Sequence, residues 1–198
     1  IPFVKNTKLK RIISGGDVFD YRVLENWANK GIRIIDKYGP TETTVSAVQR
    51  DLEFPLQNRS IGKPLGDTTC YVVDNYNSLQ AIGVAGELCI GGTGVARGYL
   101  NQPELTKEKF IKNPFGTGRI YKTGDLVRWT TEGNIDFLGR IDQQVKINGF
   151  RIELGEVETA INASNLVDTS AIIAKEHTGS KQLVANCVFK ANNYETLI

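Results

Sequence analysis

The stretch LKRIISGGDVFDYRVLENWANKGIRIIDKYGPTE, residues 9–42, carries the pattern that decides the fold. It begins with a short apolar strand, Leu9–Ile13, that ends at a Ser-Gly-Gly-Asp turn. Apolar residues then recur three positions apart from Val18 to Trp27, which indicates one face of a helix, and IRII follows as a second strand. This spacing predicts a βαβ unit with a parallel sheet. The loops after both strands should then emerge at one edge, where α/β folds bind ligands.

The pattern of residue types along the sequence changes twice after this unit. From residue 60 to 139, short β-rich runs separated by Gly, Asn and Pro predict an antiparallel barrel or sandwich, interrupted by a helix at ELTKEKF, residues 104–110. After GRIDQQVKING, one helix and two strands predict a small second domain. We therefore predict a mixed α+β and α/β fold. Residues 1–139 form the end of a βαβ sheet and a β-rich, barrel-like subdomain, and residues 140–198 form a hinge and part of a small α+β domain.

The composition excludes several classes of protein. Hydrophobic residues make up 40% and charged residues 23%, and the net charge of +2 gives no reason to expect nucleic acid or an anionic membrane as a partner. No apolar run approaches the ~20 residues that span a bilayer. Cys70, Cys89 and Cys187 lie far apart in apolar runs, which favours reduced thiols in a cytoplasmic protein. We read His177 as a solvated loop residue, with a catalytic role as the alternative.

The turn KYGPTETT, residues 37–44, is the first candidate for chemistry. Gly39 and Pro40 stiffen the chain and aim the two residues that follow. Thr41 could bond a phosphate, Glu42 could hold Mg²⁺, which prefers hard oxygen ligands, and Tyr38 offers a flat face to a base. The alternative is an ordinary helix N-terminus that is capped by Thr41.

Three further stretches carry weaker signals. In SGGD, Gly15 and Gly16 let a ligand approach the backbone, although Asp17 could instead cap a helix. In YKTGDLVRW, Asp125 could accept bonds from both hydroxyls of a ribose, or could be a turn aspartate of a hairpin. In GRIDQQVKINGFR, positively charged residues cluster where the residue pattern changes for the second time. They form either a solvated face or a hinge that carries charge toward an anion.

Taken in order, five segments resemble the motifs of adenylate-forming enzymes, and most closely the adenylation domains of nonribosomal peptide synthetases. They are YGPTETTVSA, IGKPLGDTTCYVVD, GELCIGGTGVARGYLNQPELT, YKTGDLVRW and GRIDQQVKINGFRIELGEVE, within residues 12–158. The resemblance implies a ligase of antibiotic biosynthesis. It would use Mg²⁺ and ATP to convert an amino acid or related carboxylic acid to an acyl-adenylate. The acyl group would then pass to the phosphopantetheine thiol of a partner, the peptidyl carrier domain.

The resemblance also implies a role for each matching residue around the nucleotide. Tyr38 would stack on adenine, in a turn shared with Gly39, while Gly15, Gly16 and Asp17 line the adenine side. Thr41 would contact the α-phosphate and Glu42 would bind Mg²⁺. Asp125 would hold the ribose hydroxyls, and Arg140 would reach the nucleotide.

Further implied roles concern the small domain and the substrate. Asp142 would be the hinge about which residues 140–198 rotate as a lid, Lys146 would lie near the ribose, and Gly149 would face the pantetheine arm. Asn148 departs from the arginine that the pattern often has, which bears on the second half-reaction. The substrate pocket would be lined by Ile12, Ser14, Lys37, Val45 and Ser46. The Lys37 ammonium would pair with an acidic or polar substrate, unless it extends to solvent.

The sequence lacks an initiator Met, and we expect it to be part of a longer protein. We expect the family's phosphate loop and the acid that grips the substrate amine to lie before it, and the family's C-terminal lysine to lie after it, so the chain alone would be inactive. Two alternatives stay open. One is an acyl- or aryl-CoA ligase or a D-alanine–carrier-protein ligase, and the other is a non-catalytic binding or scaffold module.

Overall fold

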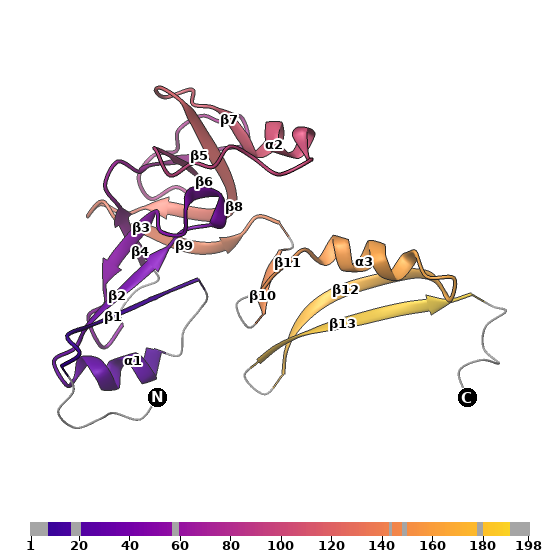
Figure 1. Cartoon of the computed structure of the whole chain (residues 1–198), viewed down its shortest axis with the longest axis horizontal. Coiled ribbons are helices and arrows are strands. Elements are labelled where there is room, and N and C mark those ends of the chain that lie inside the picture. Colours follow the sequence, from indigo (N-terminus) through magenta and orange to yellow (C-terminus); the bar gives the residue numbers. More distant parts are fainter. Residues whose placement is uncertain are drawn as a thin grey trace. The chain divides into compact units, whose positions relative to one another are not determined.

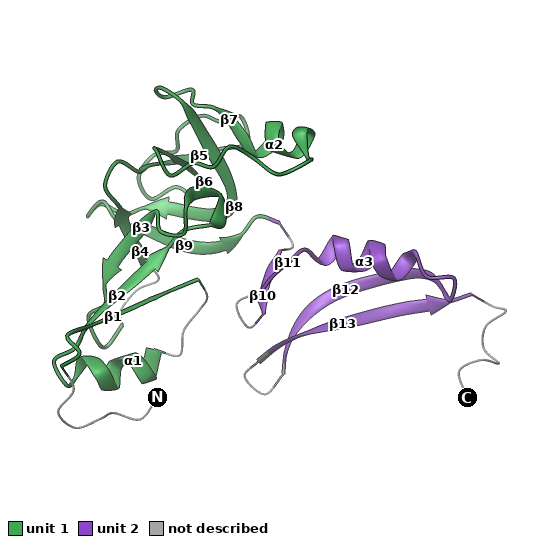
Figure 2. Ribbon diagram, in the orientation of Figure 1, with its two compact units in different colours: residues 1–141 green, residues 142–198 purple. Residues whose placement is uncertain are grey.

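The computed structural model describes residues 8–16, 21–56, 60–142, 144–147, 150–177 and 180–190, and the structural statements below refer to these residues. The chain separates into two compact units, residues 1–141 and residues 142–198 (Figure 2). Each unit is described by itself.

Unit 1 begins with the strand–helix–strand unit that the sequence predicts. Strands β1 (Arg11–Gly15) and β2 (Arg33–Tyr38) pair in parallel, and helix α1 (Tyr21–Ala28) connects them. Leu24 of α1 is buried with Ile32, Ile34 and Leu52. It lies on the apolar helix face that the residues three positions apart predict. One detail differs from expectation. Ser14 and Gly15 belong to β1 rather than to a loop, because Gly15 continues the ladder opposite Lys37.

The remaining strands of unit 1 extend the same sheet. They are β3 (Val48–Asp51), β4 (Ser60–Pro64), β5 (Thr69–Val73), β6 (Gly86–Gly91), β7 (Phe110–Lys112), β8 (Arg119–Trp129) and β9 (Ile135–Arg140). The order is β1-β2-β3-β4-β9-β8-β6-β5, with β7 paired to β8 (Figure 1). The 3-10 helix η1 (Thr41–Thr43) follows β2, and helix α2 (Pro103–Lys109) precedes β7. The sequence predicts a separate barrel or sandwich here, whereas the described strands continue one nine-stranded sheet.

Strand β4 is the reason that the sheet is continuous. Its first half pairs with β9 through Ser60 and Gly62, and its second half pairs with β3 through Lys63 and Pro64. Gly62 has φ +99°, and a Cβ there would lie 1.9 Å from the backbone oxygen of Gln49. Only glycine allows the backbones to approach so closely at the point where β4 changes partner.

The main core of unit 1 lies where the long antiparallel strands meet. Its members are aliphatic and almost completely buried: Ala47, Val48, Val72, Leu88, Ile90, Val127 and Ile135. Tyr38 and Phe137 are partly buried against this cluster. The core therefore supports both the end of β2 and the hairpin of β8 and β9.

Unit 2 has the helix and two long strands that the sequence predicts. Strand β10 (Val145–Ile147) pairs antiparallel with β11 (Phe150–Ile152), and β12 (Val167–His177) pairs antiparallel with β13 (Ser180–Phe189). Helix α3 (Leu154–Asn162) packs on β12, with Leu154, Val167 and Ile172 buried. His177 is the last residue of β12 and not a loop residue. In the described ranges of both units, no helix is long and apolar enough to cross a membrane.

Candidate active site

The turn after β2 presents two polar side chains on a short 3-10 helix. Pro40 is extended, at φ −74° and ψ 160°, and occupies the cap position of η1 without a side-chain cap. Thr41 is therefore not a helix cap, and that alternative is wrong. The turn is closed by the Thr44 amide, which donates to the Thr41 carbonyl at 3.1 Å, and by the Ala47 amide, which donates to the Tyr38 carbonyl at 2.9 Å. Thr41 is exposed and Glu42 is buried.

Glu42 is held by the loop that follows β6. The Tyr99 hydroxyl donates to Glu42 Oε1 at 2.7 Å and lies 3.3 Å from the Tyr121 hydroxyl. The Ala96 amide donates to the Glu42 carbonyl at 2.8 Å. Burial, together with the bonds to Tyr121 and Glu42, raises the pKa of Tyr99, so the phenol stays protonated and serves as a donor. The result is a carboxylate that is only 7% exposed and is fixed at both its backbone and its side chain.

Asp125 is the centre of a second cluster. Its Oδ2 accepts a hydrogen bond from the Tyr38 hydroxyl, and its Oδ1 accepts from Arg140 Nη1 at 2.9 Å. Arg140 Nη1 also donates to the Thr123 carbonyl at 2.9 Å. Burial first, and then the nearby Asp125 charge, raise the pKa of Tyr38 well above 10, so Tyr38 also remains a donor. Asp125 is 6% exposed and lies within β8, so the alternative of an ordinary turn aspartate is wrong.

A β-bulge explains how a residue inside a strand can serve a site. Lys122 pairs with Cys89 and Leu126 pairs with Glu87, so the three residues 123–125 lie opposite Leu88 alone. Gly124 takes φ +71°, and its amide donates to Glu87 Oε1 at 3.0 Å. Such a bulge changes the direction of the side chain that follows it. On the other edge, Asp125 pairs directly with Arg140 of β9, which accounts for the ion pair.

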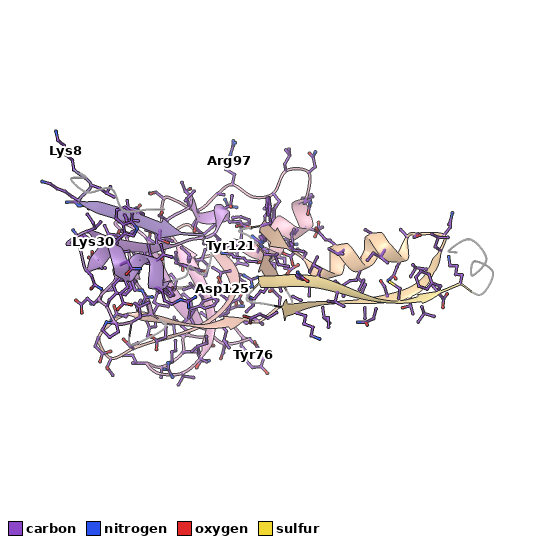
Figure 3. The ribbon with its side chains drawn as sticks, turned by 90° about the horizontal axis from the view of Figure 1, so that it is seen from below. Lys8, Lys30, Tyr76, Arg97, Tyr121 and Asp125 are labelled. Carbon is purple, nitrogen blue, oxygen red and sulfur yellow. The ribbon has the colours of Figure 1, made fainter. Side chains whose placement is uncertain are left out.

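The two clusters are built on the same two segments. Tyr38 and Glu42 belong to one turn, and Asp125 and Tyr121 belong to β8. Figure 3 shows Tyr121 and Asp125 within the body of the sheet, whereas Tyr76 and Arg97 extend away from it. Asp125 thus connects the YGPTE, YKTGD and GR motifs in one cluster, and Tyr99 connects the YGPTE, ARGYL and YKTGD motifs in the other. Together the two clusters contain three tyrosines, two buried carboxylates and a guanidinium.

The expected substrate-pocket residues lie around β1, β2 and the turn. Ile12 packs in the cluster beneath α1, and Ser14 is buried on the same face of the strand, with no hydrogen-bond partner for its Oγ among the described residues. Lys37 pairs with Gly15 and so projects to the other face of the β1–β2 pair. Val45 is 72% exposed, and Ser46 is partly buried.

The other residues expected near the nucleotide or in unit 2 make few described contacts or lie outside the described residues. Gly15 is in β1 and Gly16 bends the chain at φ +91°, whereas Asp17 lies outside the described residues. In unit 2, Asp142 Oδ1 accepts from the Gln144 amide at 3.1 Å, and Lys146 is exposed on β10 opposite Arg151. Asn148 and Gly149 also lie outside the described residues.

Sequence reasoning missed three residues that hold the site: Tyr99, Tyr121 and Glu87. Tyr99 lies in ARGYL, within one of the five motif segments. The motif indicates that this stretch matters, but it does not indicate that Tyr99 donates to Glu42. The roles of Tyr121 and Glu87 depend on strand register, which the motif does not carry.

Comparison with known proteins identifies the chain. The family of AMP-binding enzymes matches residues 4–100. Gramicidin S synthase 2 of Aneurinibacillus migulanus is 42% identical over 193 residues, which cover 96% of this chain and 4% of that protein. Bacitracin synthase 3 of Bacillus licheniformis is 47% identical over 184 residues, which cover 92% of this chain and 3% of that protein. This chain is part of a nonribosomal peptide synthetase adenylation domain.

Solved adenylation domains have the same fold. An NRPS protein containing adenylation and PCP domains aligns with a TM-score of 0.79 and 29% identity, over 93% of this chain and 39% of that chain. A four-domain nonribosomal peptide synthetase bound to AMP and glycine aligns with a TM-score of 0.61 and 36% identity, over 93% of this chain and 14% of that chain. The resemblance that the motifs carry is confirmed. This adenylation-domain chain spans only a small part of the length of its curated relatives.

Proposed function

We propose that unit 1 supplies the nucleotide- and magnesium-binding part of an adenylation site. The whole enzyme would activate an amino acid or a related carboxylic acid with ATP, forming an acyl-adenylate and pyrophosphate. It would then pass the acyl group to the phosphopantetheine thiol of a peptidyl carrier domain. One observation carries this proposal: Tyr38, Asp125 and Arg140, which come from three separate motifs, form one hydrogen-bonded network, and Glu42 lies in the short helix η1 just after Tyr38.

The residues around Asp125 suit the nucleoside of ATP. A carboxylate has about four acceptor positions, so ribose hydroxyls can add to the bonds from Tyr38 and Arg140. The Tyr38 ring lies at the end of β2, where adenine would stack, and Gly15, Gly16 and Asp17 would line the adenine side. The Arg140 guanidinium is partly exposed, and it would bring positive charge to the nucleotide.

The residues around Glu42 suit Mg²⁺ beside substrate phosphates. No group of three or more His, Cys, Asp or Glu side chains gathers within the described ranges, so a closed protein cage is not what these residues offer. Magnesium often takes only one or two protein carboxylates and completes its shell with phosphate and water oxygens. Glu42 would hold the ion, and Thr41 would contact the α-phosphate. When bound, the ion would neutralise charge on the phosphates.

The roles that we propose for unit 2 and for the substrate pocket are supported by family membership alone. Asp142 would act as the hinge of the lid, Lys146 would approach the ribose, and Gly149 would face the pantetheine arm. The substrate would lie near Ile12, Ser14, Val45 and Ser46, and Lys37 would reach an acidic or polar side chain of it from the other face of the β1–β2 pair. Identities of 42% and 47% to peptide synthetases favour an amino acid over the substrates of CoA ligases. A cytoplasmic location stays a prediction.

Exchange of Asp125 tests the nucleotide site. In an intact adenylation domain that carries this sequence, Asp125→Asn removes the charge that ribose hydroxyls would bond. Hydrogen bonds to charged groups contribute about 1.5–3 kcal/mol, so the KM for ATP should rise about 10- to 100-fold. Asp51→Asn is the matched control, because Asp51 pairs with the exposed Arg33 on the same sheet. Pyrophosphate exchange and equilibrium binding of AMP are the measurements. Equal effects of the two substitutions would remove Asp125 from the site.

A further inference from the structure

Tyr99 is the residue outside the expected site that makes the most direct contact with it. Its hydroxyl is 2.7 Å from Glu42 Oε1, and it reaches Glu42 from a segment 57 residues farther along the chain. None of the roles proposed above involves Tyr99. The bond is therefore a feature of the site that still needs an explanation.

The backbone at Tyr99 and just before it is fixed by polar contacts. The Tyr99 amide donates to Thr106 Oγ1 of α2 at 2.9 Å. Arg119 of β8 donates from its two Nη atoms to the carbonyls of Arg97 and Ala96, at 3.1 and 2.9 Å. A hydroxyl that is delivered from a loop held at three points has a defined position, and this is what the orientation of another side chain requires.

The ring of Tyr99 is fixed by aromatic packing. It meets Phe110 edge-on, with ring centroids 5.4 Å apart, and Phe110 in turn packs against Tyr121 at 5.0 Å. Tyr121 is 1% exposed. The Tyr99 ring thus rests on a buried aromatic cluster, and only its hydroxyl end reaches Glu42.

The hydrogen bonds of this cluster have one direction. An ionised carboxylate can only accept, so the Tyr99 hydrogen points to Glu42. The Tyr99 oxygen can then accept from the Tyr121 hydroxyl, 3.3 Å away. Donation from Tyr121 polarises the Tyr99 hydroxyl and strengthens its bond to Glu42.

We propose that Tyr99 is the positioning residue of the Glu42 carboxylate, with Tyr121 as its supporting donor. This inference rests on the proposed role of Glu42 as a magnesium ligand. Magnesium tolerates little departure from octahedral geometry, so the orientation of a single protein carboxylate matters more than it does for a flexible ion such as Ca²⁺. Partners that orient a metal ligand typically change metal affinity or activity 10- to 100-fold when they are removed.

The test compares two Tyr→Phe exchanges in an intact adenylation domain that carries this sequence. Tyr99→Phe keeps the ring and removes the donor to Glu42. Tyr71→Phe is the matched control, since Tyr71 also packs on a phenylalanine, Phe115, and its hydroxyl accepts from Asn113 at 3.4 Å, away from Glu42. The probe is Mn²⁺ with a non-hydrolysable ATP analogue, and free Mn²⁺ is followed by electron paramagnetic resonance. The metal dependence of pyrophosphate exchange is measured in parallel.

We expect Tyr99→Phe to weaken Mn²⁺ binding about 10-fold or more, and Tyr71→Phe to leave it within about twofold. Glu42→Gln separates the two proposals. If Glu42→Gln leaves Mn²⁺ affinity unchanged, the magnesium role of Glu42 is lost, and the role of Tyr99 with it. If Glu42→Gln weakens binding but Tyr99→Phe behaves like Tyr71→Phe, only the positioning role is wrong. Should Tyr99→Phe fail to fold, Tyr121→Phe removes the supporting donor and must weaken Mn²⁺ binding in the same direction.

Discussion

Replacing Arg140 by Met should destabilise unit 1 because it removes the guanidinium that pairs with the Asp125 charge. Asp125 is buried, and its Oδ1 lies 2.9 Å from Arg140 Nη1. Removal of one member of a fully buried ion pair costs about 3–5 kcal/mol. The Arg140 side chain is 22% exposed and Tyr38 still donates to Asp125, so we expect about 2–3 kcal/mol. For a unit of this size, that free energy lowers the melting temperature by roughly 4–12 °C.

The same hairpin provides a matched control. Arg128 and Asp136 also pair across β8 and β9, but the Arg128 side chain is 47% exposed. Exposed pairs contribute about 0–1 kcal/mol, so Arg128→Met should lower the free energy of unfolding by no more than that. Urea unfolding of the full 198-residue chain gives both values. In a double-mutant cycle, Asp125→Asn should recover part of the loss that Arg140→Met causes. Equal losses for the two arginines would refute the conclusion that Asp125 is a buried charge stabilised by Arg140.

Three further predictions concern single positions in the folded chain. Because the pKa of Tyr38 is raised in the fold and not in the unfolded chain, the folded state keeps its proton while the unfolded state loses it above about pH 10. Tyr38 alone should therefore lower the free energy of unfolding by about 1.4 kcal/mol per pH unit there, in addition to the declines from Tyr99 and Cys89, and Tyr38→Phe, but not the exposed Tyr76→Phe, should reduce the slope by that amount in alkaline melts. Val45 takes φ +68° while largely exposed, so Val45→Gly should raise the free energy of unfolding by about 1 kcal/mol in urea titrations. Burial raises the pKa of the Cys89 thiol to about 12, so Cys89 should resist iodoacetamide at about pH 8 until the chain unfolds, as mass spectrometry would detect.

Local periodicity predicted the elements whose contacts are close in sequence. The apolar residues three positions apart from Val18 to Trp27 predicted α1, and the short runs on each side predicted β1 and β2. Their parallel pairing followed from the helix between them, because parallel strands are joined by a crossover connection that is usually a helix. The limits of β1 were less accurate, since Gly15 is paired to Lys37, and a pairing partner 22 residues away leaves no mark on the local pattern.

Tertiary register decided the features that sequence reasoning did not reach. A Gly-Asp pair such as Gly124-Asp125 is typical of a turn, which is why a turn aspartate was the alternative. In the structure the same two residues lie in a bulge within β8, because the amide of Gly124 bonds to Glu87 on the neighbouring strand. The continuous sheet depends likewise on β4, which changes partner at Gly62. Motif order identified Glu42 and Asp125 as candidates, but it contained no information about Tyr99 as a donor.

The geometry of the candidate site depends on two backbone segments more than on any single side chain. Tyr38, at the start of the turn, bonds to Asp125 of β8. Glu42, later in the turn, bonds to Tyr99, which lies beside Tyr121 of β8. Tyr121 precedes Asp125 by four residues on the same strand. Four residues of regular strand span roughly 13 Å, and the bulge shortens that span. The distance between the proposed sugar-binding and metal-binding ends is thus set by the turn length and the strand register. Insertion of one residue in either segment would keep every motif residue and still separate the two clusters.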